Sequence, residues 1–327
     1  VNKMDRLPEE TAHNEFWSLG LGEPHPVSSV SGKGSGDVLD AIVAELPPPV
    51  EEAESEDEVI RVAVIGKPNV GKSSFINRLL NEERHVVGPI AGTTRDAIDS
   101  PMKYHGRRIV FIDTAGLRRQ ARTKEDVEFY SVLRTERAIE RSDICVLLID
   151  ATEEVSVQDL KVAEKAWDSG RGLIIVANKW DLVENKETNS AAAYEKHIHD
   201  RAPQLRWVPV LFTSALTGQR VQKALDLILQ VDEERRRRIP TGEVNEILEE
   251  LAQRQQPPHV QGRPVKFYYG TQAQVEPPMF VIFTNQPKGV TESYSRYLMN
   301  GFRSRWGFAG TPIWLRFRGR REESARP

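Results

Sequence analysis

Cysteine is nearly absent from this sequence: Cys145 is the only one in 327 residues. An internal disulfide is therefore impossible, as is usual for a protein that folds in a reducing compartment. Cys145 lies in an apolar run at residues 144–149, where we expect a buried strand. The sequence also lacks any apolar stretch near the ~20 residues that cross a membrane, and it opens with no secretory signal. These absences favour a cytoplasmic protein with no membrane span and no disulfide partner.

Neither sign of charge dominates, since the formal net charge of the whole chain is −3. This average does not indicate a nucleic-acid binder, but acidic and basic residues are segregated along the chain. Residues 47–58 combine prolines with acidic side chains and are predicted to form an extended, self-repelling linker. A length of 327 residues is enough for about two domains.

Three short motifs follow one another along the chain. Residues 66–73 read GKPNVGKS, residues 113–116 read DTAG, and residues 178–181 read NKWD, in the order that is typical of GTP-binding domains. The first is a glycine-rich loop that cradles phosphates, the second couples magnesium to the γ-phosphate, and the third selects guanine over adenine. A phosphate loop alone also occurs in ATPases. The three motifs together predict a domain that binds and hydrolyses GTP.

Short apolar strands alternate with helical stretches from residue 59 onward. This alternation predicts a mostly parallel sheet with helices on both faces, the α/β fold of a P-loop GTPase domain. Ligands bind at the carboxyl ends of the strands in such sheets, and all three motifs fall there. The expected strands are residues 60–65, 108–112, 144–149, 173–176 and 208–212, with a helix at residues 73–80.

The phosphate and metal side of the site has an expected role for each motif residue. Lys72 is predicted to reach the β- and γ-phosphates, and the Ser73 hydroxyl to bind Mg²⁺. Asp113 is expected to hold the metal through water, and Gly116 to donate its N–H to the γ-phosphate. The predicted nucleotide-binding residues are Gly66, Asn69, Val70, Gly71, Lys72, Ser73, Ser74, Asp113, Thr114, Ala115, Gly116, Asn178, Lys179, Asp181, Ser214 and Ala215.

The base side of the site is read by the third motif. Asp181 offers two acceptors to the N1–H and the 2-amino group of guanine, a donor pair that adenine lacks. Asn178 is expected to brace the loop, and Lys179 to lie along the base plane. The backbone of Ser214 and Ala215 is expected to contact the guanine oxygen.

Two features set this site apart from the best-known GTPases. Leu117 stands where many of them carry the glutamine that orients the attacking water, and a leucine cannot do so. Thr94, with Thr93 as the alternative, is placed to complete the magnesium shell. With Asn69, these features resemble the translation-factor-related GTPases that use potassium, which implies that Asn69 helps to hold K⁺ beside the phosphates. The predicted catalytic residues are Lys72, Thr94 and Gly116, and the predicted metal ligands are Ser73, Thr94 and Asp113 for Mg²⁺ and Asn69 for K⁺.

The opening of the chain repeats part of this domain. Residues 2–5 (NKMD) parallel residues 178–181, and residues 28–32 parallel residues 214–218. Internal repeats of this kind change the domain assignment. We expect residues 1–46 to be the C-terminal remnant of a first GTPase domain whose front is absent. Its guanine motif is Asn2, Lys3 and Asp5, which could hold no nucleotide tightly without a phosphate loop.

The basic run at residues 235–238 introduces a third region. We expect helices at residues 241–255 and 291–305, the first capped by Thr241, and strands at residues 265–269, 279–283 and 313–317. This order resembles a KH module, a small α+β domain that grips nucleic acid with a G-x-x-G loop between two helices. The G-x-x-G pattern at residues 307–310 precedes the last strand instead and is interpreted as a tight turn. The candidate RNA contacts are Lys288, Arg296, Arg303, Arg305, Arg316, Arg318, Arg320 and Arg321; a solvated basic helix face is the alternative.

The whole chain resembles the EngA (Der) family of tandem-domain ribosome-assembly GTPases. The resemblance rests on the motifs above, the repeat, and phrases such as FWSLGLGEP at residues 16–24 and GFAGTPI at residues 307–313. It implies a bacterial-type cytoplasmic enzyme that uses GTP, Mg²⁺ and K⁺ and acts on the large ribosomal subunit and its rRNA. The predicted parts are 1–46 (remnant), 47–58 (acidic linker), 59–234 (second GTPase domain), 235–320 (KH-like domain) and 321–327 (tail).

Two other functions stay open. A GTP-dependent partner in RNA modification has a similar GTPase domain, but it needs a C-terminal cysteine or a modification domain, and neither is present. An RNA-binding module with a purely structural nucleotide is the second alternative. Intact Lys72, Ser73, Thr94 and Asp113 argue against it.

Overall fold

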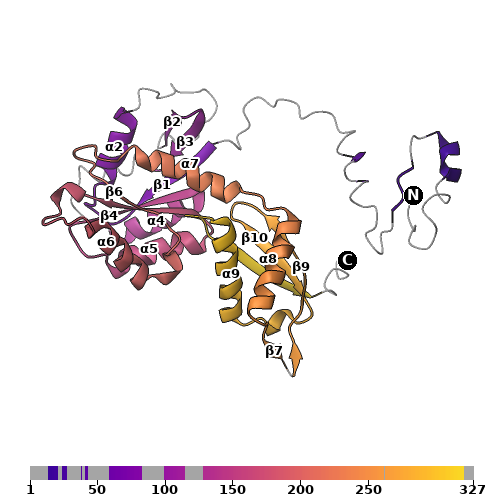
Figure 1. The fold of residues 1–327 in the computed structure, drawn as a ribbon. Helices are drawn as coiled ribbons and strands as arrows, with labels where there is room; N and C mark the ends of the chain where they lie inside the picture. The colour runs from indigo at the N-terminus through magenta and orange to yellow at the C-terminus, as the bar shows by residue number, and fades with distance from the viewer. Residues whose placement is uncertain are drawn as a thin grey trace. The chain divides into compact units, whose positions relative to one another are not determined.

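The computed structural model describes residues 14–20, 24–27, 38, 41–42, 59–82, 99–114, 128–260 and 262–319. The chain divides into two compact units, Val1–Asp57 and Glu58–Pro327. The first unit contains the 3₁₀ helix η1 (Asn14–Leu19), and the guanine-type motif at residues 2–5 lies outside the described residues, so the remnant of a first domain stays a prediction. The strands and helices that follow belong to the second unit (Figure 1).

The first part of the second unit, residues 59–236, is called here the α/β domain. Its sheet has the order β2-β3-β1-β4-β5-β6, in which β2 pairs antiparallel with β3 and every other pairing is parallel. The expected α/β fold class is therefore confirmed. Its elements are β1 (Val59–Ile65), α2 (Lys72–Glu82), β2 (Ser100–Tyr104), β3 (Arg107–Phe111), α4 (Glu128–Arg141), β4 (Ile144–Asp150), α5 (Val157–Asp168), β5 (Gly172–Asn178), η3 (Trp180–Leu182), α6 (Ser190–Arg201), η4 (Pro203–Leu205), β6 (Val210–Phe212) and α7 (Lys223–Arg236).

Two hydrophobic layers cover the two faces of this sheet. Alternate residues of β1 separate between them: Val62 and Val64 pack with α2 and α7, whereas Ala63 and Ile65 pack with α4, α5 and α6. Strands β4 and β5 are buried along nearly their whole length, because helices exclude water from both sides. Cys145 is fully buried in β4, as expected.

Two features of the α/β domain differ from the sequence-based expectation. The antiparallel edge strand β2 was not expected, because its sequence SPMKY contains a proline and only two inward-facing side chains, Met102 and Tyr104. The last strand is shorter than residues 208–212, since its pairing with β5 begins only at Val210.

The second part of the second unit, residues 237–319, is called here the α+β domain. Its helices and long strands follow the expected helix–strand–strand–helix–strand order, with a short unexpected hairpin of β7 and β8 after the first helix. Helices α8 and α9 cover the same face of a sheet ordered β11-β10-β9 (Figure 1). The elements are α8 (Thr241–Arg254), β7 (His259–Val260), β8 (Arg263–Pro264), β9 (Phe267–Gln274), β10 (Met279–Thr284), η5 (Pro287–Gly289), α9 (Glu292–Trp306) and β11 (Trp314–Gly319).

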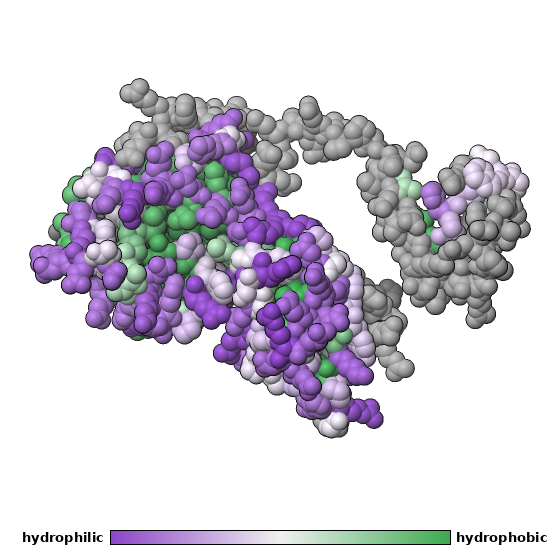
Figure 2. All heavy atoms as spheres, in the orientation of Figure 1, coloured by the Kyte–Doolittle hydropathy of each residue, from purple (hydrophilic) through white to green (hydrophobic). Residues whose placement is uncertain are grey.

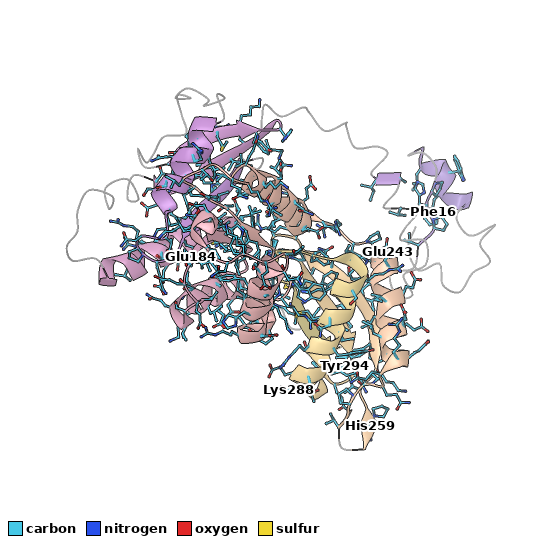
Figure 3. The ribbon with its side chains drawn as sticks, turned by 60° about the vertical axis from the view of Figure 1, so that its left-hand side comes forward. Phe16, Glu184, Glu243, His259, Lys288 and Tyr294 are labelled. Carbon is cyan, nitrogen blue, oxygen red and sulfur yellow. The ribbon has the colours of Figure 1, made fainter. Side chains whose placement is uncertain are left out.

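The expected cap of α8 is wrong. Pro240 occupies the N-cap position without a side-chain cap, and Thr241 is already the first helical residue. The Thr241 hydroxyl instead lies 3.0 Å from the hydroxyl of Thr271 in β9. Helix α9 does have a hydroxyl cap, because the Thr291 side chain accepts from the N–H of Tyr294. Tyr294 is buried and donates to the Gln255 carbonyl, whereas Lys288 is exposed just before α9 (Figure 3).

Arg303 of α9 locks the two domains together. It is 3% exposed, lies over the rings of Trp167 and Trp207 at 5.3 and 5.6 Å, and donates to the carbonyls of Phe308 and Thr311 at 2.8 Å each. Burial lowers the pKa of Arg303 to about 9, so the side chain remains a cation at neutral pH. Its charge is met by aromatic faces and carbonyl oxygens within the interface.

The turn at residues 307–310 completes this interface. The Gly310 N–H donates to the Trp207 carbonyl at 2.8 Å, and the Gly310 carbonyl accepts from Leu173 N–H at 2.7 Å. The predicted domain boundary at residue 235 falls inside the last turn of α7, where Arg235 is buried against Asp143 and Asp232. The α/β domain therefore extends to the end of α7 in packing terms.

None of the helices in the described part of the chain is long and apolar enough to cross a membrane.

Candidate nucleotide-binding site

The phosphate loop lies between the carboxyl end of β1 and the start of α2. Gly66 and Gly71 both have positive φ, at 138° and 97°. A Cβ on Gly66 would lie 2.2 Å from the Leu148 carbonyl oxygen, and one on Gly71 would lie 2.4 Å from Nδ2 of Asn178. Side chains at these two positions would therefore disrupt the loop. Because both residues are glycines, the inner curve of the loop is lined by backbone, as a phosphate site requires.

Lys72 closes the phosphate loop on itself. Its Nζ donates to the carbonyls of Gly66 and Lys67 at 2.8 and 2.5 Å. Burial lowers the pKa of Lys72 to about 8. Among the described residues, the partners of this largely buried ammonium are neutral carbonyl oxygens. An anionic partner would stabilise its charge further, so the loop fits the phosphates of a nucleotide.

Asn178 joins the phosphate loop to the loop after β6. It is 2% exposed at the end of β5. Its Nδ2 donates to the Val70 carbonyl at 2.8 Å, and its Oδ1 accepts from the Ala215 N–H at 2.9 Å and from the Thr213 hydroxyl at 3.4 Å. One side chain thus fixes the distance between the phosphate loop and the segment at residues 214–215.

Lys179 and Asp181 follow in the left-handed turn that opens η3. Lys179 has a φ of 60°, and its Nζ lies 2.5 Å from Oδ2 of Asp150 at the end of β4. Burial alone would raise the pKa of Asp150, but hydrogen bonds from Lys179 and Thr152 outweigh it and hold that pKa below its usual value. Oδ1 of Asp181 is shielded from solvent and has no hydrogen-bond partner among the described residues. Such an orphaned acceptor fits the paired N–H donors of a guanine edge.

Asp113 lies at the carboxyl end of β3 with a φ of 55°. Its N–H donates to Oδ1 of Asp99, and its carboxylate lies 4.0 Å from Arg134. Burial raises the pKa of Asp113, against the opposing charge of Arg134. Ser73 is the second residue of α2, while Thr94, Ala115 and Gly116 lie outside the described residues.

The expected Mg²⁺ ligands are the carboxylate of Asp113 and the hydroxyl groups of Ser73 and Thr94. No cluster of three or more His, Cys, Asp or Glu side chains occurs within the described ranges. A hard cation such as Mg²⁺ accepts one protein carboxylate when water and nucleotide phosphates supply the other oxygens. Asp113 and Ser73 fit that mode of binding. Asn69, the expected K⁺ ligand, is exposed in the phosphate loop with a φ of 65°.

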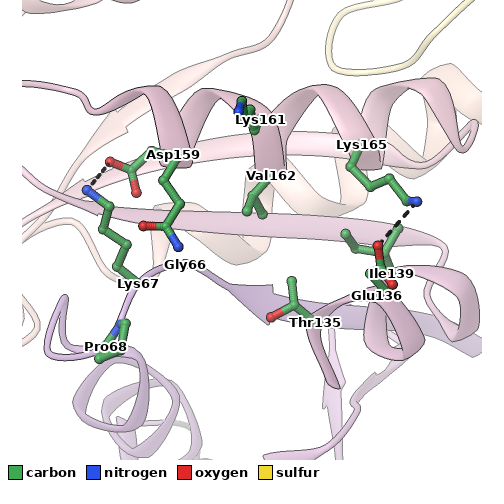
Figure 4. A pocket seen from close by; sticks show the side chains of 11 residues that line it. Gly66, Lys67, Pro68, Thr135, Glu136, Ile139, Asp159, Lys161, Val162 and Lys165 are labelled. Carbon is green, nitrogen blue, oxygen red and sulfur yellow. Dashed lines mark ion pairs between the residues drawn. The ribbon is translucent and has the colours of Figure 1, made fainter. Parts of the chain in front are cut away.

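A cavity of about 330 Å³ lies behind the phosphate loop, between α4 and α5 (Figure 4). Its lining includes Lys67 and Asp159, which form an ion pair at 3.1 Å, but neither Lys72 nor Asp181. Asp159 also caps α5 reciprocally with Ser156. The cavity therefore adjoins the phosphate loop at Gly66, and the ion pair ties Lys67 of that loop to the capped start of α5.

Asp150 and Asp159 were not predicted from the sequence, although each left a signal there. Asp150 directly follows a buried apolar run and so stands at the carboxyl end of a parallel strand. Asp159 stands three residues after Ser156, which is the spacing of a capping box. The link from Asp159 to Lys67 left no such signal, since it joins side chains far apart in the sequence.

Two family models match the second unit. Residues 61–179 match the model described as "50S ribosome-binding GTPase", and residues 238–318 match "KH-domain-like of EngA bacterial GTPase enzymes, C-terminal". Over 313 residues the chain is 56% identical to the GTPase Der of Gemmatimonas aurantiaca, covering 96% of this chain and 71% of that protein. The GTPase Der of Thermomicrobium roseum is 48% identical over 326 residues, covering 99% of this chain and 71% of its own length. The chain belongs to the GTPase Der family.

Membership of the GTPase Der family confirms the expected family and enzyme class: the chain is a GTPase with a KH-like C-terminal domain. The α/β domain is its P-loop GTPase domain, and the α+β domain is its KH-like domain. Among solved structures, a similar one is described as Era in complex with MgGDPNP and nucleotides 1506–1542 of 16S ribosomal RNA. It shares 23% identity with this chain at a TM-score of 0.41, covering 80% of this chain and 93% of that one.

The expected RNA contacts of this GTPase Der chain fall into three groups. Lys288, Arg296, Arg305, Arg316 and Arg318 are exposed. Arg303 is not an RNA contact, because it is buried between the two domains, where it serves their packing. Arg320 and Arg321 lie outside the described residues.

Proposed function

We propose that this chain is a GTP-hydrolysing switch that acts in assembly of the large ribosomal subunit. The observation that carries the nucleotide part is the joining of three loops by Asn178, which sets the phosphate loop, the guanine motif and residues 214–215 in one arrangement. The ribosomal part is supported by the family description, which names binding to the 50S ribosome for the GTPase domain.

In the proposed site, Lys72 exchanges its two carbonyl partners for the β- and γ-phosphates. The change is favourable because a charge-assisted bond to phosphate is stronger than a bond to a neutral carbonyl. Asp181 reads the guanine edge through its orphaned oxygen, while the ion pair with Asp150 holds Lys179 for contact with the base plane. Xanthine lacks the 2-amino donor, and adenine lacks both donors that Asp181 requires.

Ser73, Asp113 and Thr94 are the proposed Mg²⁺ ligands, and Asn69 is the proposed K⁺ ligand. Bound Mg²⁺ supplies charge that neutralises the phosphates, and K⁺ supplies the charge that an arginine finger gives in other GTPases. The residues of this chain position the nucleotide and hold the two cations beside its phosphates. Because Leu117 cannot orient water, intrinsic turnover is slow in this proposal.

GTP hydrolysis in potassium and in sodium buffer, with and without large ribosomal subunits, tests the proposal. We expect turnover to depend on potassium and to rise when subunits are added. Asn69→Ala should remove most of the difference between the two cations, whereas Lys72→Ala should remove turnover in both. Equal rates in the two buffers would refute the potassium site, and indifference to subunits would refute the ribosomal role while leaving the guanine-nucleotide site in place.

A further inference from the structure

The sheet of the KH-like domain has one face covered by α8 and α9. The other face, called here the open face, carries exposed side chains on its outer strands, while Val281 on the central strand is only 6% exposed. Phe280, Ile282 and Phe317 belong to the core beneath α8 and α9. Successive side chains of a strand point to opposite faces, so their neighbours Val281, Phe283, Arg316 and Arg318 point to the other face. The register agrees, because Val281 pairs with Arg316 and Phe283 pairs with Arg318.

Four side chains on the open face, Tyr269, Phe283, Arg316 and Arg318, are called here the sheet platform. Phe283 pairs with Tyr269 of β9, and their ring centroids lie 6.0 Å apart at an angle of 41°. Tyr269 is 43% exposed, and both arginines are exposed. Tyr269, Phe283 and Arg318 therefore lie side by side across β9, β10 and β11, so that an aromatic pair adjoins a cation.

The charged side chains on the three strands of the platform are of one sign. The sequences of β9, β10 and β11 contain no Asp or Glu, and the described residues include no carboxylate in ion-pair contact with Arg316 or Arg318. The helix face differs, since α8 alone carries four glutamates, and Arg296 of α9 is paired with Glu292 at 2.8 Å. That face is broadly hydrophilic in Figure 2. Polyanions are thus favoured at the platform over the helices.

The G-x-x-G pattern of this domain is not available to nucleic acid, and it does not stand between two helices as in a KH module. The G-x-x-G pattern at residues 307–310 forms a turn whose Gly310 is bonded to the GTPase domain on both its N–H and its carbonyl. Phe308 within it is fully buried. This turn is therefore excluded as an RNA contact, because its backbone and Phe308 are used in packing.

We propose that the sheet platform binds a single-stranded segment of large-subunit rRNA. Bases stack on Tyr269 and Phe283, and the phosphates pair with Arg316 and Arg318. Stacking and phosphate pairing together are how sheet surfaces hold unpaired RNA. The inference rests on the proposed ribosomal function, and it deepens that function by naming the surface and the unpaired state of the RNA.

Binding of the full chain to large ribosomal subunits and to a twelve-nucleotide uridine-rich RNA tests the platform. Tyr269→Ser should weaken oligonucleotide binding about tenfold without changing its salt dependence. The double variant Arg316→Ser/Arg318→Ser should weaken binding and lower the slope of log affinity against log salt by about 0.7 for each phosphate that no longer pairs with an arginine. The double variant Arg296→Ser/Arg305→Ser removes the same charge from α9 and should change little. GTP hydrolysis without subunits should be equal in all variants, which excludes misfolding.

The outcomes separate the platform from the proposed function. A parent chain that binds no large subunits would overturn the ribosomal function itself. Subunit binding that survives the platform changes but fails in Arg296→Ser/Arg305→Ser would overturn the platform alone. Loss of subunit binding with unchanged oligonucleotide binding would mean that a ribosomal protein, and not RNA, occupies the platform, which also overturns the inference.

Discussion

Replacement of Asn178 by alanine removes the side chain that joins the phosphate loop to the loop after β6. The change leaves the Val70 carbonyl and the Ala215 N–H without their partners in a region where both residues are buried. Each unsatisfied buried group costs about 1–3 kcal/mol, so we expect the free energy of unfolding to fall by about 2–6 kcal/mol. If the lost contacts stabilise the GDP-bound state by about 1.4 kcal/mol more than the nucleotide-free state, the affinity for GDP falls about tenfold.

Urea unfolding of the nucleotide-free chain and titration with a fluorescent GDP analogue measure the two effects. Asn178→Asp is the informative companion, because it keeps the acceptor for the Ala215 N–H but turns a carboxylate oxygen toward the Val70 carbonyl. Thr213→Val removes only the weakest of the three bonds, at 3.4 Å, and should cost no more than about 1 kcal/mol. The reasoning is refuted if Asn178→Ala unfolds within about 0.5 kcal/mol of the parent, the level of an ordinary surface substitution.

Four further changes test other contacts. Asp159→Ala removes both the cap of α5 and the partner of Lys67, and should lower the unfolding free energy by about 1–2 kcal/mol in a denaturant titration; a loss no larger than that of Lys67→Ala would contradict the capping role. Because the folded pKa of Lys72 is about 8 and its ordinary value is 10.5, the folded chain releases this proton first as pH rises between those values. The free energy of unfolding of the nucleotide-free chain should then rise between about pH 8 and pH 10.5, while the affinity for GDP falls. A Lys72→Met variant whose stability and affinity depend on pH in the same way would show that Lys72 is not the titrating group. Arg303→Met strips two buried carbonyls of their donor and should destabilise the joined domains by about 2–4 kcal/mol, measured by urea unfolding against Arg296→Met as a neutral control. Asp181→Asn should shift nucleotide preference from GTP toward xanthosine triphosphate in competition binding, and unchanged GTP affinity would exclude Asp181 as the guanine reader.

Much of the nucleotide site could be predicted because its residues come from short contiguous motifs. The phosphate loop at residues 66–73 and the turn at residues 178–181 each place several groups through local backbone geometry. The strand–helix alternation then predicts that both lie at the same edge of a parallel sheet. The edge strand β2 was less visible, because an amphipathic strand with a proline leaves a weak pattern.

The failures of prediction fall on residues whose role depends on a distant partner. Arg303 is a basic side chain in a basic stretch of the sequence, which is typical of an RNA contact. Only the packing of α9 against Trp167 and Trp207 makes it an interface residue. Thr241 is of a residue type that is common at helix N-caps, but β9 brings Thr271 beside its hydroxyl. In both cases a side chain able to face water was drawn into packing between elements far apart in the sequence.

The sequence by itself determined the order of the motifs and the α/β and KH-like classes of the two domains, and it predicted the roles proposed for Lys72, Asp113 and Asp181. These depend on local backbone geometry and on hydrophobic periodicity, which a linear chain records directly. Only the tertiary structure decided that Asn178 joins three loops, that the turn at residues 307–310 is taken up in domain docking, and that two arginines and two aromatic rings share an open sheet face. Those features arise from strand register and long-range packing, where the energy of a side chain depends on neighbours that the chain reaches only by folding.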